Sequence, residues 1–346
     1  MKMSEILGIP SGAAPRAGKR LPGPRLMRAL AGLLCAAAAL GAHAQAAPWP
    51  SKPVHLIVSW PPGGGADNVA RVLAQQLAVH LDQSVVIENR AGAGGMVGAM
   101  AVARADPDGY TLLFASDAEL TIAPAVRKSV PYDPLKDLTP ISLISSGPFM
   151  LAASAGFPPN SLPELVAYAK NNPGKVNYGS FGPGTNGHML GEQLNATAGI
   201  DTVHVAYKGS APALSDLVGG QIQYAFFSPM AVMDMVREKK IKAIALLAPK
   251  RLDNAGDIPT AAEQGLSTLV GGTRFGLLGP AGTPKAVVDK MHAAVVASLR
   301  SPEIRKSFDT MYTLPIGSSP DEFRTFIQTE TGKWRKLAND IGMQLD

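Results

Sequence analysis

Residues 54–67, VHLIVSWPPGGGAD, decide the fold of this chain. The apolar run from Val54 to Ser59 ends at a glycine-rich turn, and apolar residues then recur at helical spacing from Asp67 to Leu81. A strand that passes through a glycine turn into a helix is the repeating unit of a mostly parallel sheet with helices on both faces. The stretch therefore predicts an α/β fold.

The same order of strand, glycine-rich turn and helix recurs along the chain. It predicts strands over 85–88 and 110–115 with a helix over 96–104 between them. It starts again with a strand over 175–180, a turn and a helix over 188–198, and further strands follow over 202–205, 222–227 and 241–247. We interpret this pattern as two doubly wound α/β lobes.

The end of the chain has too few strands for a third domain. One apolar run over 275–278 leads into helices over 284–299, from residue 302, and over 320–341. We expect this tail to return and cover the first unit. The predicted domains are lobe 1 over 47–148 and 275–346 and lobe 2 over 149–274, with crossings near 145–153 and 271–280 that form a two-stranded hinge.

The excess positive charge lies in the first 44 residues. The 346 residues carry a net charge of +5, with 46% hydrophobic and 17% charged residues, a composition typical of globular domains. Of 32 Lys and Arg and 27 Asp and Glu, six bases and Glu5 lie in residues 1–44, which leaves 26 of each in the remainder. A neutral remainder gives no electrostatic reason to expect nucleic acid or an anionic membrane as a partner.

Residues 1–46 are predicted to be a cleaved secretory signal peptide. A basic segment precedes the uncharged run Ala29 to Ala42, and the small residues around His43 and Gln45 fit a cleavage site. The alternative, a transmembrane anchor, needs about 20 apolar residues, more than this run offers. We expect a periplasmic protein with no membrane insertion after cleavage. The one cysteine, Cys35, falls in the leader, so the mature protein has no thiol chemistry.

Two glycine-rich turns, Trp60 to Asp67 and Ser180 to His188, each join a strand to a helix. Glycine lets main-chain N–H groups approach a ligand closely, and a helix N-terminus adds partial positive charge. Such turns can bind a carboxylate or phosphate without a basic side chain. The alternative is that both are only tight turns, with Asp67 as a helix cap and His188 as a turn residue.

Nucleotide-binding and enzymatic functions have weaker support. The run GPGTNG at 182–187 matches a dinucleotide fingerprint, but a polar strand precedes it and no acid follows at the usual distance. A hydrolase that uses Ser180 and His188 stays an alternative, although residue 178 is not the glycine of a nucleophile elbow. Lys208 could be a counter-ion for an acidic ligand or a solvated lysine. The remaining histidines are scattered, so we expect no metal site: His55, His80, His204 and His292.

Several ordered motifs resemble those of the Bug receptors, the TctC-like periplasmic solute-binding components of tripartite tricarboxylate transporters. The motifs are WPPGGGAD at 60–67, VIENRAGAGG at 86–95, DGYTLL at 108–113, PYDP at 131–134, YGS at 178–180, AYKG at 206–209 and GGQ at 219–221. The resemblance implies a type II periplasmic-binding-protein fold that closes on a small organic carboxylate between its lobes. It also implies no cofactor, no catalysis and membrane transporter subunits as partners, and we expect a monomer.

The resemblance assigns ligand-binding roles to both turns. The first turn supplies Trp60, Gly63, Gly64 and Asp67, and the second supplies Ser180, Thr185, Asn186 and His188. A segment that is often small and hydroxylic in the family reads Ser116-Asp117-Ala118-Glu119 here. We predict that Asp117, rather than Glu119, faces the ligand and pairs with an amine beside its carboxylate. The alternative is that both acids cap the next helix or face solvent.

Three functions follow as hypotheses. The first is an exported receptor that captures a small carboxylate and delivers it to a tripartite tricarboxylate-type transporter. The second is the exported hydrolase with Ser180 and His188, and the third is a ligand sensor for a signalling partner. The sequence does not identify the ligand or the partner subunits.

Overall fold

The computed structural model describes residues 49–346 and contains two β-sheets. The strands of the six-stranded sheet, in spatial order, are β2 (Val85–Asn89), β1 (Val54–Val58), β3 (Thr111–Ser116), β10 (Gly272–Pro280), β4 (Leu138–Pro148) and β11 (Leu314–Pro315). Those of the five-stranded sheet are β7 (Val203–Ala206), β6 (Asn177–Ser180), β8 (Tyr224–Phe227), β5 (Met150–Ser154) and β9 (Ile241–Leu246).

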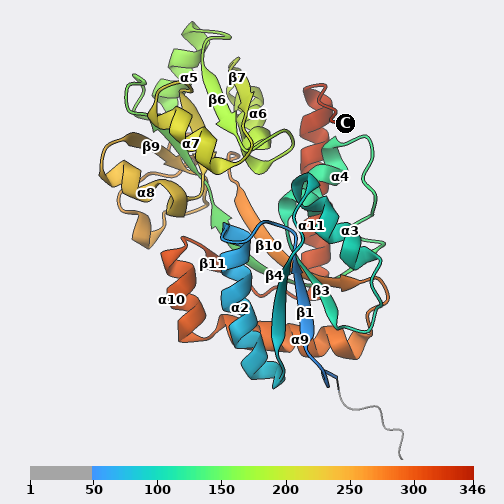
Figure 1. Cartoon of the computed structure of the whole chain (residues 1–346). Coiled ribbons are helices and arrows are strands. Elements are labelled where there is room, and N and C mark those ends of the chain that lie inside the picture. The colour runs from blue at the N-terminus through green and yellow to red at the C-terminus, as the bar shows by residue number, and fades with distance from the viewer. Residues whose placement is uncertain (1–48) are drawn as a thin grey trace, which may run out of the picture. The chain divides into compact units, whose positions relative to one another are not determined.

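The two sheets have the same strand arrangement. In each, a central strand, β1 or β6, pairs in parallel with the next two strands of its unit. One antiparallel strand, β10 or β5, is inserted beside them, and it is the strand that enters from the other sheet. This repeated order confirms the prediction of two doubly wound lobes (Figure 1).

The chain crosses between the sheets at two adjacent points. Only Phe149 separates β4 from β5, and the start of β10 lies beside it, with Gly272 opposite Pro148. The Phe149 N–H donates to Gly271 O at 2.9 Å, which ties the two crossings together. A Cβ on Gly272 would lie 2.0 Å from Gly147 O, so only glycine allows this approach. The predicted two-stranded hinge is therefore confirmed.

The predicted helices are present, together with others that the sequence analysis did not predict. The helices of residues 49–346 are α2 (Gly65–Leu81), α3 (Met96–Ala103), α4 (Ala123–Val126), α5 (Leu162–Asn171), α6 (Asn186–Ala198), α7 (Ser210–Val218), α8 (Pro229–Arg237), α9 (Lys285–Leu299), α10 (Pro302–Thr310) and α11 (Pro320–Asp340). The helices that the sequence analysis did not predict are α4, α5, α7 and α8. Shorter helical turns are η1 (Ala93–Gly95), the π-helical η2 (Ala118–Ile122) and η3 (Asp253–Ala255).

Alternation along β1 explains the layers of the first lobe. Leu56 and Val58 pack into a core that includes residues of α2, α9 and α10, whereas Ile57 packs into a core with α3 and the first half of α11. Both sets are almost completely buried, as expected of a parallel strand covered on two faces. Figure 1 shows α2 and α3 on opposite sides of β1.

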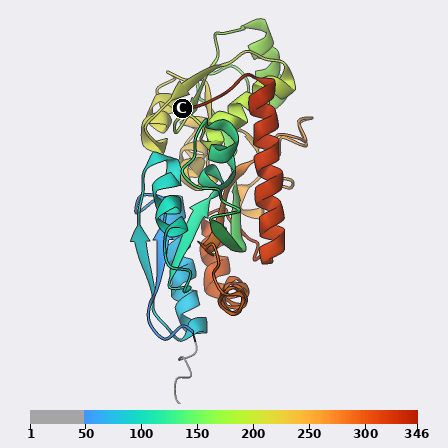
Figure 2. The ribbon, with the colours of Figure 1, turned by 90° about the vertical axis from the view of Figure 1, so that its right-hand side faces the viewer.

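The last helix reaches both lobes. Phe323 and Ile327 lie in the first-lobe core, whereas Trp334 and Ala338 join the core around Tyr178 of the second lobe. Figure 2 shows α11 as one continuous helix that extends along both lobes. The tail therefore covers the first unit through α9, α10 and half of α11, and contacts the second unit as well. The numerical lobe boundaries stay a prediction.

The predicted leader lies outside the described residues. Within residues 49–346, no helix is long and apolar enough to cross a bilayer.

Candidate functional site

The first glycine turn leads into α2 at the carboxyl end of β1. Gly64 is the N-cap residue, and no side chain among the described residues caps this helix. The carboxylate of Asp67 accepts hydrogen bonds from the Gly63 N–H at 2.9 Å, from Arg71 Nε at 2.8 Å and from Asn89 Nδ2 at 2.9 Å. The Arg71 bond holds the pKa of Asp67 down, at about 2. Asp67 is therefore not the cap; its charge is already paired, and it holds the turn in shape.

The second glycine turn leads into α6 at the carboxyl end of β6. Thr185 is the N-cap residue, yet its hydroxyl donates to Gly182 O at 2.8 Å, and within residues 49–346 no side chain caps the helix. The Gly184 N–H donates to Nδ1 of His188 at 3.1 Å. Thr185 and His188 thus hold the turn closed, and the first main-chain N–H groups of α6 keep no side-chain acceptor in the described part of the chain.

The hydroxyl of Ser180 pairs with His204 and not with His188. Ser180 Oγ lies 2.6 Å from His204 Nε2, and the rings of His188 and His204 stack with centroids 3.9 Å apart. Burial lowers the pKa of each imidazole to about 4, so both are neutral near pH 7. The hydrolase hypothesis therefore paired Ser180 with the wrong histidine. The sequence could have indicated His204 only through its place in the predicted strand over 202–205, which is β7 and pairs in parallel with β6.

The half-buried Trp60 and the buried Glu119 form one hydrogen-bonded cluster at the first turn. The carboxylate of Glu119 accepts hydrogen bonds from the Ser116 N–H at 2.8 Å, the Trp60 Nε1 at 3.3 Å, and the hydroxyls of Ser59 and Ser116. Glu119 has no exposed surface, and burial raises its pKa to about 7. The Ser116 N–H belongs to the last residue of β3, so Glu119 does not cap the next helix, and that expectation is wrong. The expectation that it faces solvent is wrong.

Asp117 connects the two lobes. It follows β3 of the first sheet, and its carboxylate accepts a hydrogen bond from Asn186 Nδ2 of the second turn at 3.0 Å. The same Asn186 nitrogen donates to Gly272 O at the hinge at 2.6 Å. Of the predicted residues, the structure thus brings Asp117 and Asn186 together. Asp117 is buried, so the alternative that it faces solvent is wrong.

Arg274 is a part of this cluster that the sequence did not single out. Its guanidinium lies 3.8 Å from Asp117 and 3.3 Å from Glu330 of α11. Burial raises the pKa of Asp117 to about 6, and Arg274 opposes that shift. The only signal for Arg274 was its place within the predicted crossing near 271–280. Asp117 therefore already has a cation beside it.

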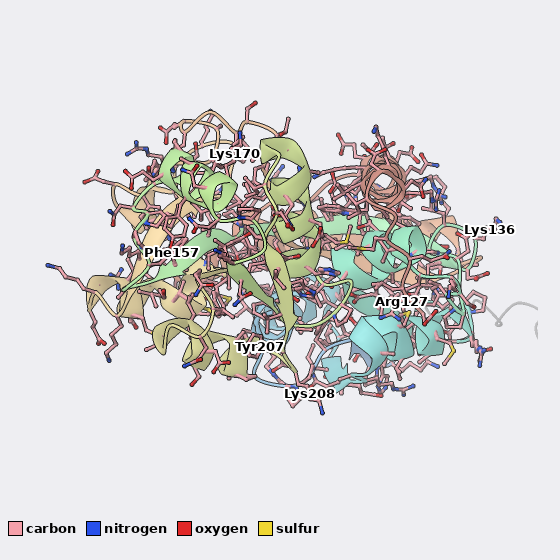
Figure 3. The ribbon with its side chains drawn as sticks, turned by 90° about the horizontal axis from the view of Figure 1, so that it is seen from above. Arg127, Lys136, Phe157, Lys170, Tyr207 and Lys208 are labelled. Atoms are coloured by element: carbon pink, nitrogen blue, oxygen red, sulfur yellow. The ribbon has the colours of Figure 1, made fainter. Side chains whose placement is uncertain are left out.

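The segment after β7 lies next to the second turn. The Tyr207 N–H donates to Ser180 O at 2.9 Å, and Lys208 follows with an exposed side chain. Figure 3 shows Tyr207 and Lys208 together at the border where the second lobe meets the elements drawn in blue. Lys208 is thus placed as a solvated lysine beside the turn. In residues 49–346, no group of three or more His, Cys, Asp or Glu side chains could hold a metal ion.

Two lobes that share the same order of core strands, a double hinge and, in each lobe, a glycine turn that leads into a helix without a side-chain cap define a two-lobed binding protein. Comparison with known proteins gives the family. Residues 69–343 match the family described as tripartite tricarboxylate transporter family receptor, TctC. The chain belongs to this family, as its motifs had indicated.

Individual relatives agree with this assignment. BugT of Bordetella pertussis is 34% identical over 318 residues, which cover 92% of this chain and 98% of that protein. The structure of MatC from Rhodopseudomonas palustris with bound malate is 33% identical, with a TM-score of 0.73 over 84% of this chain and 99% of that one. R. palustris Rpa4515 with adipate is 31% identical, with a TM-score of 0.77 over 86% and 99%.

The family is one of solute-binding receptors, so the chain is a binding protein and not an enzyme. The Ser180 and His204 pair accordingly links the start of the second turn to β7 and is not a catalytic dyad. The assignment of Trp60, Gly63, Gly64, Asp67, Asp117, Ser180, Thr185, Asn186 and His188 to ligand binding stays a prediction.

Proposed function

We propose that this protein is a periplasmic receptor that binds a small organic carboxylate between its lobes and delivers it to a tripartite tricarboxylate-type transporter. One observation carries the proposal. Each lobe has a glycine turn at the carboxyl end of its central strand, and the helix after that turn begins without a side-chain cap among residues 49–346. Uncapped helix N-termini attract anions, and a doubly wound sheet binds ligands at this edge.

The contact between Asp117 and Asn186 supports a ligand position shared by the two lobes. This contact joins the end of β3 to the second turn. Trp60 of the first turn donates a hydrogen bond to Glu119, which lies two residues after Asp117 in the chain. Two related structures carry malate and adipate, which are small carboxylates. The same chemistry in this chain needs main-chain donors from both turns and no cofactor.

A glycine substitution in the first turn tests the proposal. Gly64 has a φ of −83° and a Cβ there would lie 3.6 Å from Pro61 O, so Gly64→Ala is compatible with the fold. The added methyl would occupy space next to the N–H groups of α2. We expect the variant to lose most of the ligand-induced rise in melting temperature, while the protein without ligand melts within a few degrees of the parent.

The measurement is a thermal-shift screen with carboxylates. A ligand at 100 times its Kd adds about 2.7 kcal/mol of stability, a shift that such a screen resolves. Gly156→Ala is the matched control, because a Cβ there meets no atom within 4 Å. Normal ligand-induced stabilisation in Gly64→Ala would show that the first turn does not bind the ligand. A parent protein stabilised by no carboxylate would overturn the proposed function.

Export and delivery need separate tests. We expect the mature protein in the periplasm to begin at Gln45 or Ala47 and to be a nearly neutral monomer. N-terminal sequencing that finds Met1 or Met27 retained would contradict export. Deletion of the gene should abolish uptake of the radiolabelled ligand. Unchanged uptake with altered gene expression would instead support the sensor hypothesis.

A further inference from the structure

Glu119 gathers hydrogen-bond donors from the ends of two central strands. Ser59 follows β1 directly, Ser116 is the last residue of β3, and Trp60 opens the first glycine turn. Their hydroxyl, indole and main-chain N–H groups all donate to the one carboxylate. These donors lie at the edge of the sheet where a doubly wound lobe receives its ligand. In this lobe they are already occupied by the protein's own anion.

The charge of Glu119 is not balanced by a cation. Among residues 49–346, Glu119 forms no ion pair, whereas the neighbouring Asp117 has the guanidinium of Arg274 at 3.8 Å. Donors that are hydrogen-bonded but uncharged stabilise an ionised carboxylate without cancelling its field. Glu119 therefore contributes a net negative charge to the first lobe whenever it is ionised.

The surroundings of this carboxylate exclude water. Glu119 is completely buried, and Gly95 of η1 covers it so closely that a Cβ there would lie 2.6 Å from the carboxyl carbon. The hydroxyl of Tyr132 donates to the main-chain O of Glu119 at 2.7 Å and holds the residue in place. A buried charge is screened much less than one in water, so its effect extends to neighbouring groups.

We propose that Glu119 makes this receptor select ligands with a single carboxylate and reject the dicarboxylates of the same length. This inference rests on the proposed function, because it concerns the ligand held between the turns. One carboxylate binds the uncapped helix N-termini, and the opposite end of the ligand meets the cluster around Trp60. A second carboxylate at that end would find the donors of Ser59, Trp60 and Ser116 already bonded to Glu119. It would also be repelled by the negative charge of Glu119, which no cation balances among residues 49–346. An uncharged end meets no such opposition.

The test compares ligands of matched length in matched variants. Straight-chain monocarboxylates and α,ω-dicarboxylates of three to eight carbons are titrated by calorimetry at pH 8 into the parent, Glu119→Gln and Glu164→Gln. Glu164 is an exposed acid on α5 and serves as the charge control. We expect the best monocarboxylate to bind the parent about tenfold tighter than its dicarboxylate. Glu119→Gln should reduce that ratio at least fivefold, and Glu164→Gln should not change it.

A pH series on the parent gives a second measurement that needs no variant to fold. Burial raises the pKa of Glu119 to about 7, so the carboxylate gains a proton between pH 8 and pH 6 and its repulsion disappears. Dicarboxylate affinity should therefore rise across this range relative to monocarboxylate affinity. The groups that face Glu119 are those of Ser59, Trp60, Ser116, Gly95 and Tyr132. The neighbouring Asp117 has a pKa of about 6, so it also gains a proton near the lower end of this pH range. Any dependence that remains in Glu119→Gln comes from Asp117 or from protonation of the dicarboxylate's own second carboxyl group.

The outcomes separate this inference from the proposed function. A parent that prefers dicarboxylates, or a selectivity ratio unchanged by Glu119→Gln and by pH, would overturn the role of Glu119 and leave a carboxylate receptor in place. A parent that binds no member of either series, nor their hydroxy and amino derivatives, would overturn both.

Discussion

Three buried ionisable residues near the turns and the half-buried His204 have pKa values shifted in the direction that favours their neutral forms. Burial raises the pKa of Asp117 to about 6 and that of Glu119 to about 7, and it lowers the pKa of His188 and His204 to about 4. Each residue therefore binds protons differently in the folded and unfolded chain. Stability depends on pH through this difference, and the acids and the histidines have opposite signs.

The signs follow from the direction of each shift. The raised pKa values of the acids give stability that is present below about pH 4 and is lost as the pH rises through 6 to 7. The lowered pKa values of the histidines give stability that is present above about pH 6.5 and is lost as the pH falls through 4. Between pH 4 and 6.5 the two effects oppose each other, so the parent should show a shallow stability profile there.

Glu119→Gln should make this profile steeper. The variant removes one acid contribution and leaves the loss due to the histidines, so its free energy of unfolding should fall relative to the parent as the pH decreases from 6.5 to 4. One proton difference corresponds to about 1.4 kcal/mol per pH unit, which is an upper limit for the slope. Calorimetric melting of both proteins at pH 4.5, 5.5, 6.5 and 8 measures this difference in the free energy of unfolding. Curves that stay parallel to those of the parent and of Glu164→Gln would contradict the assignment.

At the scale of elements, the end of the chain joins the first lobe to the second turn. Leu345 pairs with the end of α4 and the residues that follow it: its N–H donates to Val126 O at 2.8 Å, and its carbonyl accepts from the Lys128 N–H at 3.0 Å. Its side chain covers Gly184, where a Cβ would lie 2.8 Å from the Leu345 Cδ1. The φ of Gly184 is +73°, so this turn depends on glycine and on the packing around it.

Leu345→Ala should loosen the second turn. The side chain is half-buried, so its truncation should cost about 1 kcal/mol of stability, less than a fully buried leucine. Ligand affinity should fall several-fold because Gly184 and the start of α6 lose a packing partner. Leu314→Ala is the control, since Leu314 on β11 is 51% exposed. Calorimetric titration and melting measure both effects. Equal affinity in the two variants would show that the tail does not act on the turn.

The elements next to glycine turns were predictable from the sequence, whereas β4 and η2 were not. The helix predicted over 67–81 begins two residues earlier, and the strand predicted over 54–59 ends one residue earlier. The segment of β4, LTPISLISSGP, contains prolines and serines that mask its strand pattern, and its strand character depends on pairing with β10. Pro124 at the start of α4 likewise hides the helical segment that begins at η2.

The two turns could be predicted because each is a local sequence pattern. The other residues of the site lie in segments that are distant in the sequence. Arg71 is on the same helix as Asp67, and its bond follows from helical spacing. His204 and Arg274 reach the site through strand pairing and the hinge crossing, which no local pattern specifies. The prediction that Asp117 pairs with an amine of the ligand did not include Arg274 for this reason.

At the scale of the whole described part of the chain, α11 is shared by both lobes. Ser319 and Glu322 form a capping box at its start, and the helix then continues past the first-lobe core to the second. Trp334 is 2% exposed and packs in the second-lobe core, far along the helix from Phe323 in the first. A helix that is continuous between two cores transmits the unfolding of one to the other.

The described part of the chain should therefore unfold as one unit although it has two sheets. We expect a single calorimetric transition for the protein without ligand, with equal calorimetric and van't Hoff enthalpies. Trp334→Ala should cost about 3 to 5 kcal/mol in the second-lobe core and weaken its link to the first, so the second lobe unfolds at a lower temperature. The ratio of van't Hoff to calorimetric enthalpy should then fall below one. Trp334→Phe keeps most of the apolar contact and should retain the single transition. Two transitions in the parent, or a uniform shift in Trp334→Ala with the ratio unchanged, would show that α11 does not couple the lobes.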